Sequence, residues 1–118
     1  MVDLNEFFQS ADWKKEKHAP VIEIKSKKPV LVEVSVGKEI EHPNTIEHHI
    51  RWIQLVFHPE GAKFPVEIGK IEFNSHGEAG QTEPKGFFSF KTNKPGTLIA
   101  FSFCNIHGFW KSEQALSL

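Results

Sequence analysis

The chain has 118 residues, of which 39% are hydrophobic, and this length predicts one domain, residues 1–118, around a single core. Its 14 basic and 15 acidic side chains leave a formal net charge of −1, which excludes a general attraction to nucleic acid or to acidic membrane surfaces. The only cysteine, Cys104, excludes an intrachain disulfide framework and a four-cysteine metal site, and it is typical of a reducing cytoplasm.

The N-terminal segment is the part of the chain with helical spacing. Within DLNEFFQSADW, Leu4, Phe7 and Phe8 fall on one side of a helix, and Asp3 is placed to cap it. No apolar leader precedes it, and no stretch approaches the ~20 apolar residues of a membrane span. We therefore expect a soluble, cytoplasmic protein with a short N-terminal helical segment and no membrane partner.

After this segment, apolar and polar residues alternate with a period of two. PVIEIKSKKPVLVEVSVGKEI predicts strands at 21–24 and 30–36, separated by a KSKKP turn. HIRWIQLVFHPEG predicts a third strand, which ends at a Pro-Glu-Gly turn.

The second half of the chain continues this pattern. FPVEIGKIEFNSHG, GFFSFKT and GTLIAFSFCNIHG each supply β-prone residues bounded by Gly, Pro or Asn, and the tail EQALSL is a candidate for a last edge strand. About seven short strands with turns at these intervals predict an all-β fold, an antiparallel β-sandwich.

Histidines in turns mark a candidate metal site. His18, His42, His48 and His107 lie in or beside turns near prolines or glycines. Because loops gather at the ends of a sandwich, these side chains can converge, and Cys104, three residues before His107, can bind the same ion. A soft thiolate with imidazoles suits iron, copper or zinc and disfavours magnesium or calcium.

The other three histidines have a plainer interpretation. We expect His49, His58 and His76 to be surface residues or hydrogen-bonded core residues, and His49 points away from the face that His48 uses on an extended backbone. A single cysteine after AFSF is by itself typical of a small buried hydrophobe. The metal hypothesis therefore rests on the free thiol together with the histidines in turns.

Three stretches together resemble a known family. EKHAPVIE, VGKEIEHPNTIEHHIRWI and SFCNIHGFW look like the one-iron, neelaredoxin-like (class II) superoxide reductases, and they are spread over most of the chain. The resemblance implies an immunoglobulin-like sandwich of seven strands, in agreement with the strand count. It also implies a mononuclear iron with four equatorial imidazoles, from His18, His42, His48 and His107, and an axial thiolate from Cys104. Without a second cysteine, a two-iron desulfoferrodoxin is excluded.

The resemblance also implies an activity and further roles. The activity is that of an oxidoreductase that reduces superoxide to hydrogen peroxide by one electron without producing oxygen. Glu16 matches a glutamate that serves as sixth ligand of the ferric iron, and Lys17 matches a lysine that attracts superoxide and orients a proton-donating water. Without the family, KKEKH would be a solvated charged loop. The family implies rubredoxin as electron donor and a homo-oligomer, a tetramer.

The surroundings of Cys104 carry two more expectations. Backbone N–H groups of NIHG are candidates to donate hydrogen bonds to the thiolate. Ile106 and Phe109 are expected to keep the cysteine side dry.

Three alternatives to this interpretation differ in class. A closed zinc site usually takes four ligands and has no redox chemistry, so five ligand-type residues count against it. A cupredoxin-like electron-transfer protein would also combine a β-sandwich, C-x-x-H and an upstream histidine, but the only methionine is Met1 and no axial methionine follows the histidine. An immunoglobulin-like interaction module would make the histidines incidental.

Overall fold

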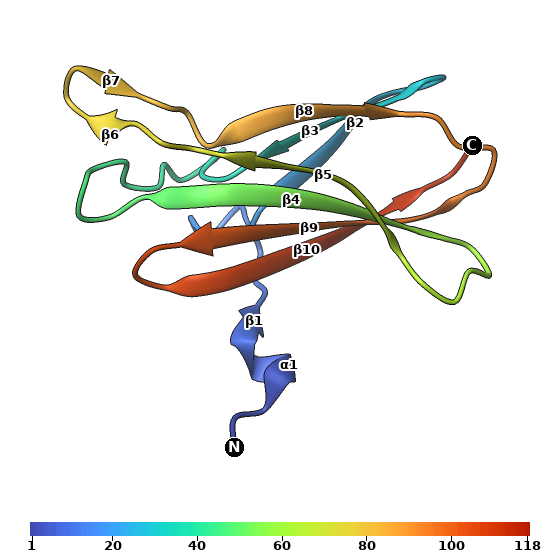
Figure 1. Ribbon diagram of the computed structural model, residues 1–118, viewed down its shortest axis with the longest axis horizontal. Coiled ribbons are helices and arrows are strands. Elements are labelled where there is room, and N and C mark those ends of the chain that lie inside the picture. The colour runs from blue at the N-terminus through green and yellow to red at the C-terminus, as the bar shows by residue number, and fades with distance from the viewer.

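Two β-sheets face each other across one core in the computed structural model, which describes residues 1–118 (Figure 1). The elements are, in chain order, α1 (Leu4–Phe7), β1 (Phe8–Gln9), β2 (Val21–Lys27), β3 (Val30–Ser35), β4 (Ile50–Pro59), β5 (Val66–Glu72), β6 (His76–Gly77), β7 (Gly80–Gln81), β8 (Lys85–Phe90), β9 (Gly96–Cys104) and β10 (Gly108–Leu116). Seven of these strands are long, and they confirm the predicted all-β sandwich with a short N-terminal helix. None of the helices has the length and apolar character needed to span a membrane.

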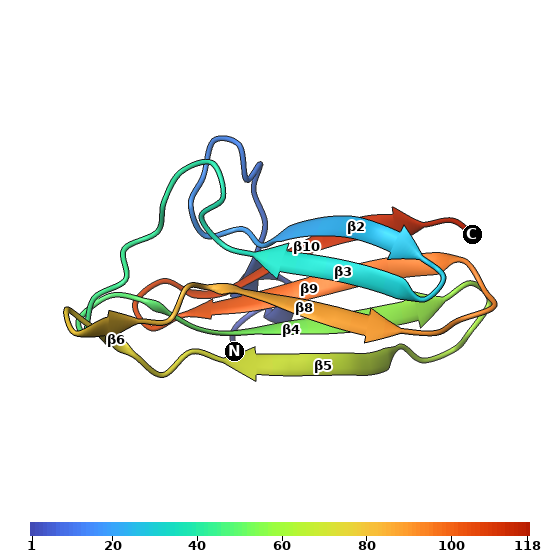
Figure 2. The ribbon, with the colours of Figure 1, turned by 90° about the horizontal axis from the view of Figure 1, so that it is seen from above.

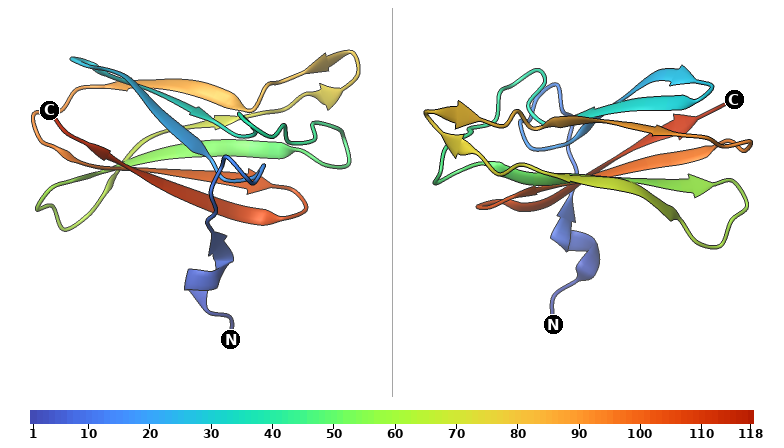
Figure 3. Two further views of the ribbon diagram at one scale, coloured as in Figure 1. Left: turned by 180° about the vertical axis from the view of Figure 1, so that it is seen from behind. Right: turned by 45° about the horizontal axis from the view of Figure 1, so that its top comes forward.

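The sheet order explains the layers. One sheet has the order β1-β10-β9-β4-β5, the other has the order β2-β3-β8, and β6 and β7 form a separate hairpin. All pairs are antiparallel except β1 with β10, which is parallel. The two further views in Figure 3 show that α1 projects from the body of the sandwich.

The core lies between the inward faces of the strands. On β3, the side chains of Val30, Val32 and Val34 are fully buried, as the period-two pattern predicts. On β9, the same alternation buries every second side chain and ends at Cys104, which belongs to the core cluster. Burial of each aliphatic side chain contributes about 1.5–3 kcal/mol. The thiol is thus held in place by the end of the hydrophobic core.

The ends of the chain differ from the sequence predictions. Asp3 caps α1 as expected, because its side chain accepts a hydrogen bond from the Asn5 N–H at 2.9 Å. The helix nevertheless ends at Phe7, since Phe8 turns extended and pairs with Phe109 on β10. The candidate last strand in the tail is part of β10, but β10 begins earlier, at Gly108, and pairs with the whole of β9.

Two internal boundaries differ as well. The KSKKP turn is shorter than predicted, because β2 continues to Lys27 through a bulge between Ile24 and Ser26. The short β6–β7 hairpin was not expected from the sequence.

Loops at one end of the sandwich bring distant segments together. Figure 2 shows the connection from β1 to β2 beside the connection from β3 to β4. The turn between β9 and β10 lies at the same end, because Cys104 pairs with Ile50 at the start of β4. The histidines that the sequence places in turns therefore meet here.

Candidate metal centre

Four imidazole rings stand in a closed cycle at this end of the sandwich. The centroids of neighbouring rings are 4.7 Å apart for His18 and His42, 4.7 Å for His42 and His48, 5.1 Å for His48 and His107, and 4.8 Å for His107 and His18. Neighbouring ring planes are inclined by 65–77°. The distance between the rings of His18 and His48 is longer, 6.3 Å, as expected for opposite corners of a square.

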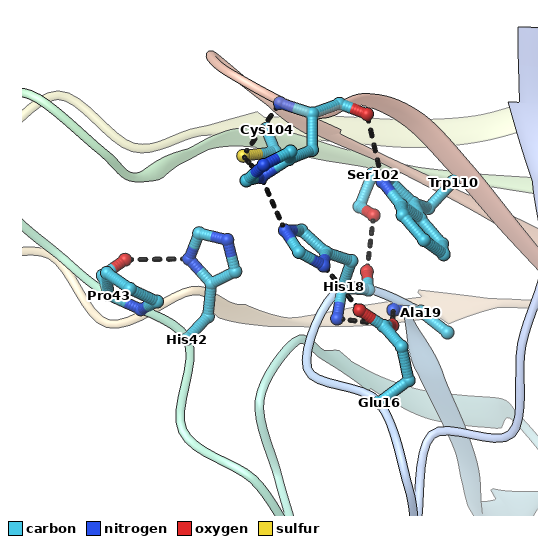
Figure 4. Close-up of polar contacts among 9 residues, drawn as sticks. Glu16, His18, Ala19, His42, Pro43, Ser102, Cys104 and Trp110 are labelled. Atoms are coloured by element: carbon cyan, nitrogen blue, oxygen red, sulfur yellow. Dashed lines mark hydrogen bonds and ion pairs between the residues drawn. The ribbon is translucent and has the colours of Figure 1, made fainter.

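The thiol of Cys104 adjoins this square. It is fully buried, and ligand atoms of His18, His42, His48 and Cys104 all lie within 4.8 Å of one another. The fourth imidazole, that of His107, places its Nδ1 3.9 Å from the sulfur and 3.1 Å from His18 Nε2. Figure 4 shows His18, His42 and Cys104 converging from separate segments. The structure thus brings together all five side chains that the sequence marks as ligands.

Two buried nitrogen atoms test whether these residues fit a metal. The Nε2 atoms of His42 and His48 are buried and have no hydrogen-bond partner. A buried polar atom left unpaired costs about 1–3 kcal/mol, so such atoms need an explanation. The Nδ1–H of His42 donates to the Pro43 carbonyl at 2.7 Å, which leaves the Nε2 lone pair free for a cation. The four imidazoles and the thiol fit a transition metal such as iron.

Burial keeps two of these imidazoles neutral. It lowers the pKa of His42 to about 4, although the bond to the Pro43 carbonyl opposes the change. It also lowers the pKa of His48, and the neighbouring imidazoles of His107 and His18 add to this effect. A neutral imidazole is the form that binds a metal, so both side chains are in the ligating state at neutral pH.

These pKa values predict that the metal-free protein loses stability in mild acid. In the unfolded chain His42 takes up a proton near pH 6.5, but in the folded chain it resists protonation until about pH 4. The unfolded state therefore binds more protons in this window, and the free energy of unfolding falls as the pH falls, by at most about 1.4 kcal/mol per pH unit for one such histidine. Urea unfolding of the metal-free protein at several pH values measures this slope. His42→Gln should flatten it, and an unchanged slope in this variant would contradict the assignment.

Glu16 is turned toward His18 rather than toward the converging ligand atoms. Its carboxylate accepts hydrogen bonds from the backbone N–H of His18 at 2.6 Å and of Ala19 at 2.9 Å, and it also contacts His18 Nδ1 (Figure 4). Burial raises the pKa of Glu16, but the hydrogen bonds from the His18 ring and from these two backbone groups outweigh it, so the pKa is lowered. The ionised carboxylate holds the ring so that Nε2 faces the centre.

Lys17 lies close to the same centre. Its side chain is half-buried, and its positive charge contributes to the lowered pKa of both His42 and His48. It therefore adds positive potential where the imidazoles meet.

The expectations for the surroundings of Cys104 had different outcomes. The backbone N–H of His107 donates to the Cys104 sulfur, with a distance of 3.4 Å, which confirms that the NIHG turn supplies a donor. The prediction for Ile106 was wrong, because this residue is 56% exposed to solvent. Phe109 is half-buried and packs on the aromatic rings of Phe8 and Phe103.

Trp110 is a contact that the sequence analysis missed. Its ring stacks on His18, with centroids 4.8 Å apart and planes 11° apart, and its Nε1–H donates to the His107 carbonyl at 3.3 Å. A last strand that starts at residue 113, as the sequence suggested, leaves Trp110 outside the β9–β10 ladder, in which it pairs with the buried Ser102.

The remaining histidines are hydrogen-bonded residues, as expected. The buried ring of His49 stacks on that of His76 at a centroid distance of 3.5 Å and contacts the Thr45 carbonyl through Nδ1. His58 Nε2 lies 2.7 Å from the Ala62 carbonyl oxygen. None of the three contributes to the ligand cluster.

Comparison with known proteins gives the family. The desulfoferrodoxin family model matches residues 10–113. The superoxide reductase of Pyrococcus horikoshii is 56% identical over 114 residues, which cover 96% of this chain and 98% of that protein.

Solved structures agree. The reduced form of superoxide reductase (neelaredoxin) from Archaeoglobus fulgidus is 56% identical and superposes with a TM-score of 0.91 over 95% of this chain and 99% of that one. A putative superoxide reductase from Thermotoga maritima is 46% identical, with a TM-score of 0.93 over 99% and 98% of the two chains. The chain belongs to the desulfoferrodoxin family and, within it, to the neelaredoxin-like superoxide reductases.

Proposed function

We propose that the square of His18, His42, His48 and His107 holds a mononuclear iron and that Cys104 binds it as a thiolate. At this centre superoxide is reduced by one electron to hydrogen peroxide, and no oxygen is produced. The observation that carries the proposal is the cycle of four imidazoles, with neighbouring centroids 4.7–5.1 Å apart, beside one fully buried thiol. When bound, iron supplies the electron and a positive charge for an anionic substrate.

The ligand types suit this reaction. Neutral imidazoles add no charge, so they leave the positive charge of a ferrous ion available to attract an anion. The low pKa values of His42 and His48 support this neutral state. A thiolate donates electron density to the metal it binds, which helps a reduced oxygen species to leave. The donor N–H of His107 stabilises the negative charge on sulfur.

Glu16 and Lys17 complete the proposed site. We assign two positions to the Glu16 carboxylate. In the first it orients His18, as in the structure. In the second it is the sixth ligand of the oxidised iron, and to reach that position it has to break its contacts with His18 and Ala19. Its position in the same loop, two residues before His18, supports this assignment. Lys17 attracts superoxide and orients a proton-donating water, and its effect on the pKa of His42 and His48 supports this role.

Lys17→Ala should bind iron normally but react more slowly with superoxide at low ionic strength. The chain has a net charge of −1, so attraction must come from the metal and from charges near it. The pull of Lys17 should fade as the Debye length shrinks from roughly 30 Å at 0.01 M salt to 8 Å at 0.15 M. Stopped-flow rates measured against salt concentration should fall more steeply for the wild type than for the variant.

Lys15→Ala is the matched control for this prediction. Lys15 is exposed in the same loop and carries the same charge, but it does not contribute to the pKa changes of the site histidines. It should keep a salt slope close to that of the wild type. Identical slopes for all three proteins would show that Lys17 has no steering role.

The proposal also covers the domain organisation, the cellular location, the electron donor and the oligomeric state. We propose that residues 1–118 work as one domain, which the single large core cluster supports. A cytoplasmic location is supported by the one free thiol. An electron donor, for which we propose rubredoxin, can approach the exposed residue His107, and the exposed apolar residues Leu4 and Phe7 are available for contacts between the subunits of the proposed tetramer.

Mixing the reduced, iron-loaded protein with superoxide in a stopped-flow instrument tests the function. We expect rapid oxidation of the iron, hydrogen peroxide as product, no oxygen release and close to one iron per chain. Oxygen release, or no reaction, would overturn the proposal. Preferential copper binding would favour the cupredoxin-like alternative. Two features of the structure speak against that alternative: four imidazoles meet at the site, and the only methionine is the exposed Met1.

A further inference from the structure

Asn105 connects two segments that carry ligands. It directly follows Cys104 in the turn after β9, and its side chain reaches the loop that holds His48. Its Oδ1 accepts a hydrogen bond from the His49 N–H at 2.8 Å, and its Nδ2 donates to the Glu47 carbonyl at 2.9 Å. Its backbone N–H also donates to the His49 carbonyl, at 3.2 Å. Asn105 therefore binds the residues on both sides of His48.

The loop that carries His48 has a fixed shape of its own. The Thr45 N–H donates to the His48 carbonyl at 2.9 Å, and the His48 N–H lies 3.2 Å from the Thr45 carbonyl and 3.1 Å from the Thr45 hydroxyl. These contacts close a tight turn before β4. They do not tie this turn to the segment after Cys104. The pairing of Ile50 with Cys104 places the turn from its β4 end, and the bonds from Asn105 hold it on both sides of His48.

The orientation of the His48 ring depends more on the position of its own backbone than the orientation of the His18 or His42 ring does. The Nδ1 of His18 contacts Glu16, and that of His42 donates to the Pro43 carbonyl. No hydrogen bond in the structure reaches either ring nitrogen of His48, and its Nε2 is buried without a partner. The direction of this imidazole therefore follows from the backbone that Asn105 holds.

The turn itself does not explain why residue 105 is an asparagine. Asparagine is common in turns because it tolerates a left-handed backbone or caps its own turn. Here no residue other than glycine has a positive φ, and Gly108 takes that conformation in this turn. The side chain of Asn105 bonds only to residues 56 and 58 positions earlier in the chain. Both of its polar groups thus serve the contact with the other loop.

We propose that Asn105 is a positioning residue that sets the place of the His48 imidazole relative to the Cys104 thiolate. This inference rests on the proposed iron site and deepens it. Groups that orient metal ligands from outside typically change metal affinity by about 10–100-fold when they are mutated. Because the overlap between a thiolate and its metal depends on the placement of the other ligands, a shift of His48 also changes the thiolate-to-iron absorption.

Two variants test the proposal. Asn105→Ala removes both side-chain bonds, and Asn105→Asp keeps the acceptor for the His49 N–H but loses the donor to the Glu47 carbonyl. In the folded variants we expect an Fe²⁺ affinity about 10-fold weaker in competition with a chelator. We also expect a displaced or weakened thiolate absorption in the oxidised protein. Circular dichroism checks the fold, and Asn105→Asp carries the test if Asn105→Ala does not fold.

Thr82→Ala is the matched control. The Thr82 hydroxyl accepts a hydrogen bond from the Ser75 N–H at 3.2 Å, and neither residue lies in a segment that carries a ligand. It should lower stability and leave the absorption unchanged. A wild-type spectrum and affinity in folded Asn105 variants, or an equal change in Thr82→Ala, would overturn the proposal. A wild type that shows the absorption but does not reduce superoxide would contradict the proposed function and leave this inference standing.

Discussion

Cys104→Ser should abolish the visible thiolate-to-iron absorption of the oxidised protein and slow superoxide reduction by more than the roughly 10–100-fold loss typical of an outer partner of a metal ligand. Cys104 is the only sulfur at the site, and it is fully buried at the end of the core. A serine hydroxyl stays protonated at neutral pH and donates far less electron density than a thiolate. Visible spectra and stopped-flow rates of the iron-loaded variant measure both effects.

Ser102→Ala provides the control for Cys104→Ser. Ser102 is fully buried two residues earlier on the same inward face of β9, and its hydroxyl donates to the His18 carbonyl at 3.1 Å. Its removal should cost about 1 kcal/mol of stability and retain the colour, because Glu16 and Trp110 still hold the His18 ring in place. A blue or violet band that survives in Cys104→Ser would refute the thiolate assignment. Loss of the band in both variants would show that it reports packing rather than the sulfur.

Strand positions could be predicted wherever one face of a strand is buried. On β9 the alternation from Leu98 to Cys104 requires the thiol to face inward, because a side chain of the opposite parity would face solvent. The sequence could not place the start of β10 in this way. Gly108 forms the turn with a φ of +80°, and Phe109 and Trp110 follow it directly, so the strand begins within the motif itself.

The N-terminal helix shows the opposite error. Its helical spacing continues beyond Phe7, but a helix of this length is marginal without packing. Phe8 instead packs on Phe101 and Phe109, with ring centroids 5.4 and 5.1 Å apart, and the backbone becomes extended there. Tertiary contacts therefore override the local pattern.

The sequence was sufficient to predict which residues are candidate ligands, but not which other residues contact those ligands. Soft and imidazole ligands near turns indicate a metal, and the structure brings them together. The partner of each ligand depends on how the loops meet, and spacing in the sequence holds no information about this. Glu16 on the outer nitrogen of His18, Trp110 on its face and Asn105 beside His48 are all contacts of this kind.

Gly37→Ala should both destabilise the protein and weaken iron binding, although residue 37 is not a ligand. Gly37 has a φ of +82°, and a Cβ at this position would lie 2.7 Å from the backbone nitrogen of His42. The left-handed conformation alone costs a residue with a side chain about 1–2 kcal/mol. The contact is with backbone, so relief requires the loop that carries His42 to move. We therefore expect an Fe²⁺ affinity at least about 10-fold weaker, as when ligand placement is lost.

Gly61→Ala separates the two causes. Gly61 has nearly the same φ, +80°, but a Cβ there meets nothing within 4 Å, and it lies in the turn between β4 and β5, away from the metal centre. This variant should lose only the stability associated with the backbone conformation and should bind Fe²⁺ as the wild type does. Urea unfolding and chelator competition on both variants measure the two effects. Equal iron affinity in Gly37→Ala and Gly61→Ala would show that the His42 loop can accommodate the added methyl group without moving the ligand. Weaker binding in Gly37→Ala alone would show that the close approach of residue 37 to the His42 backbone holds this ligand in place.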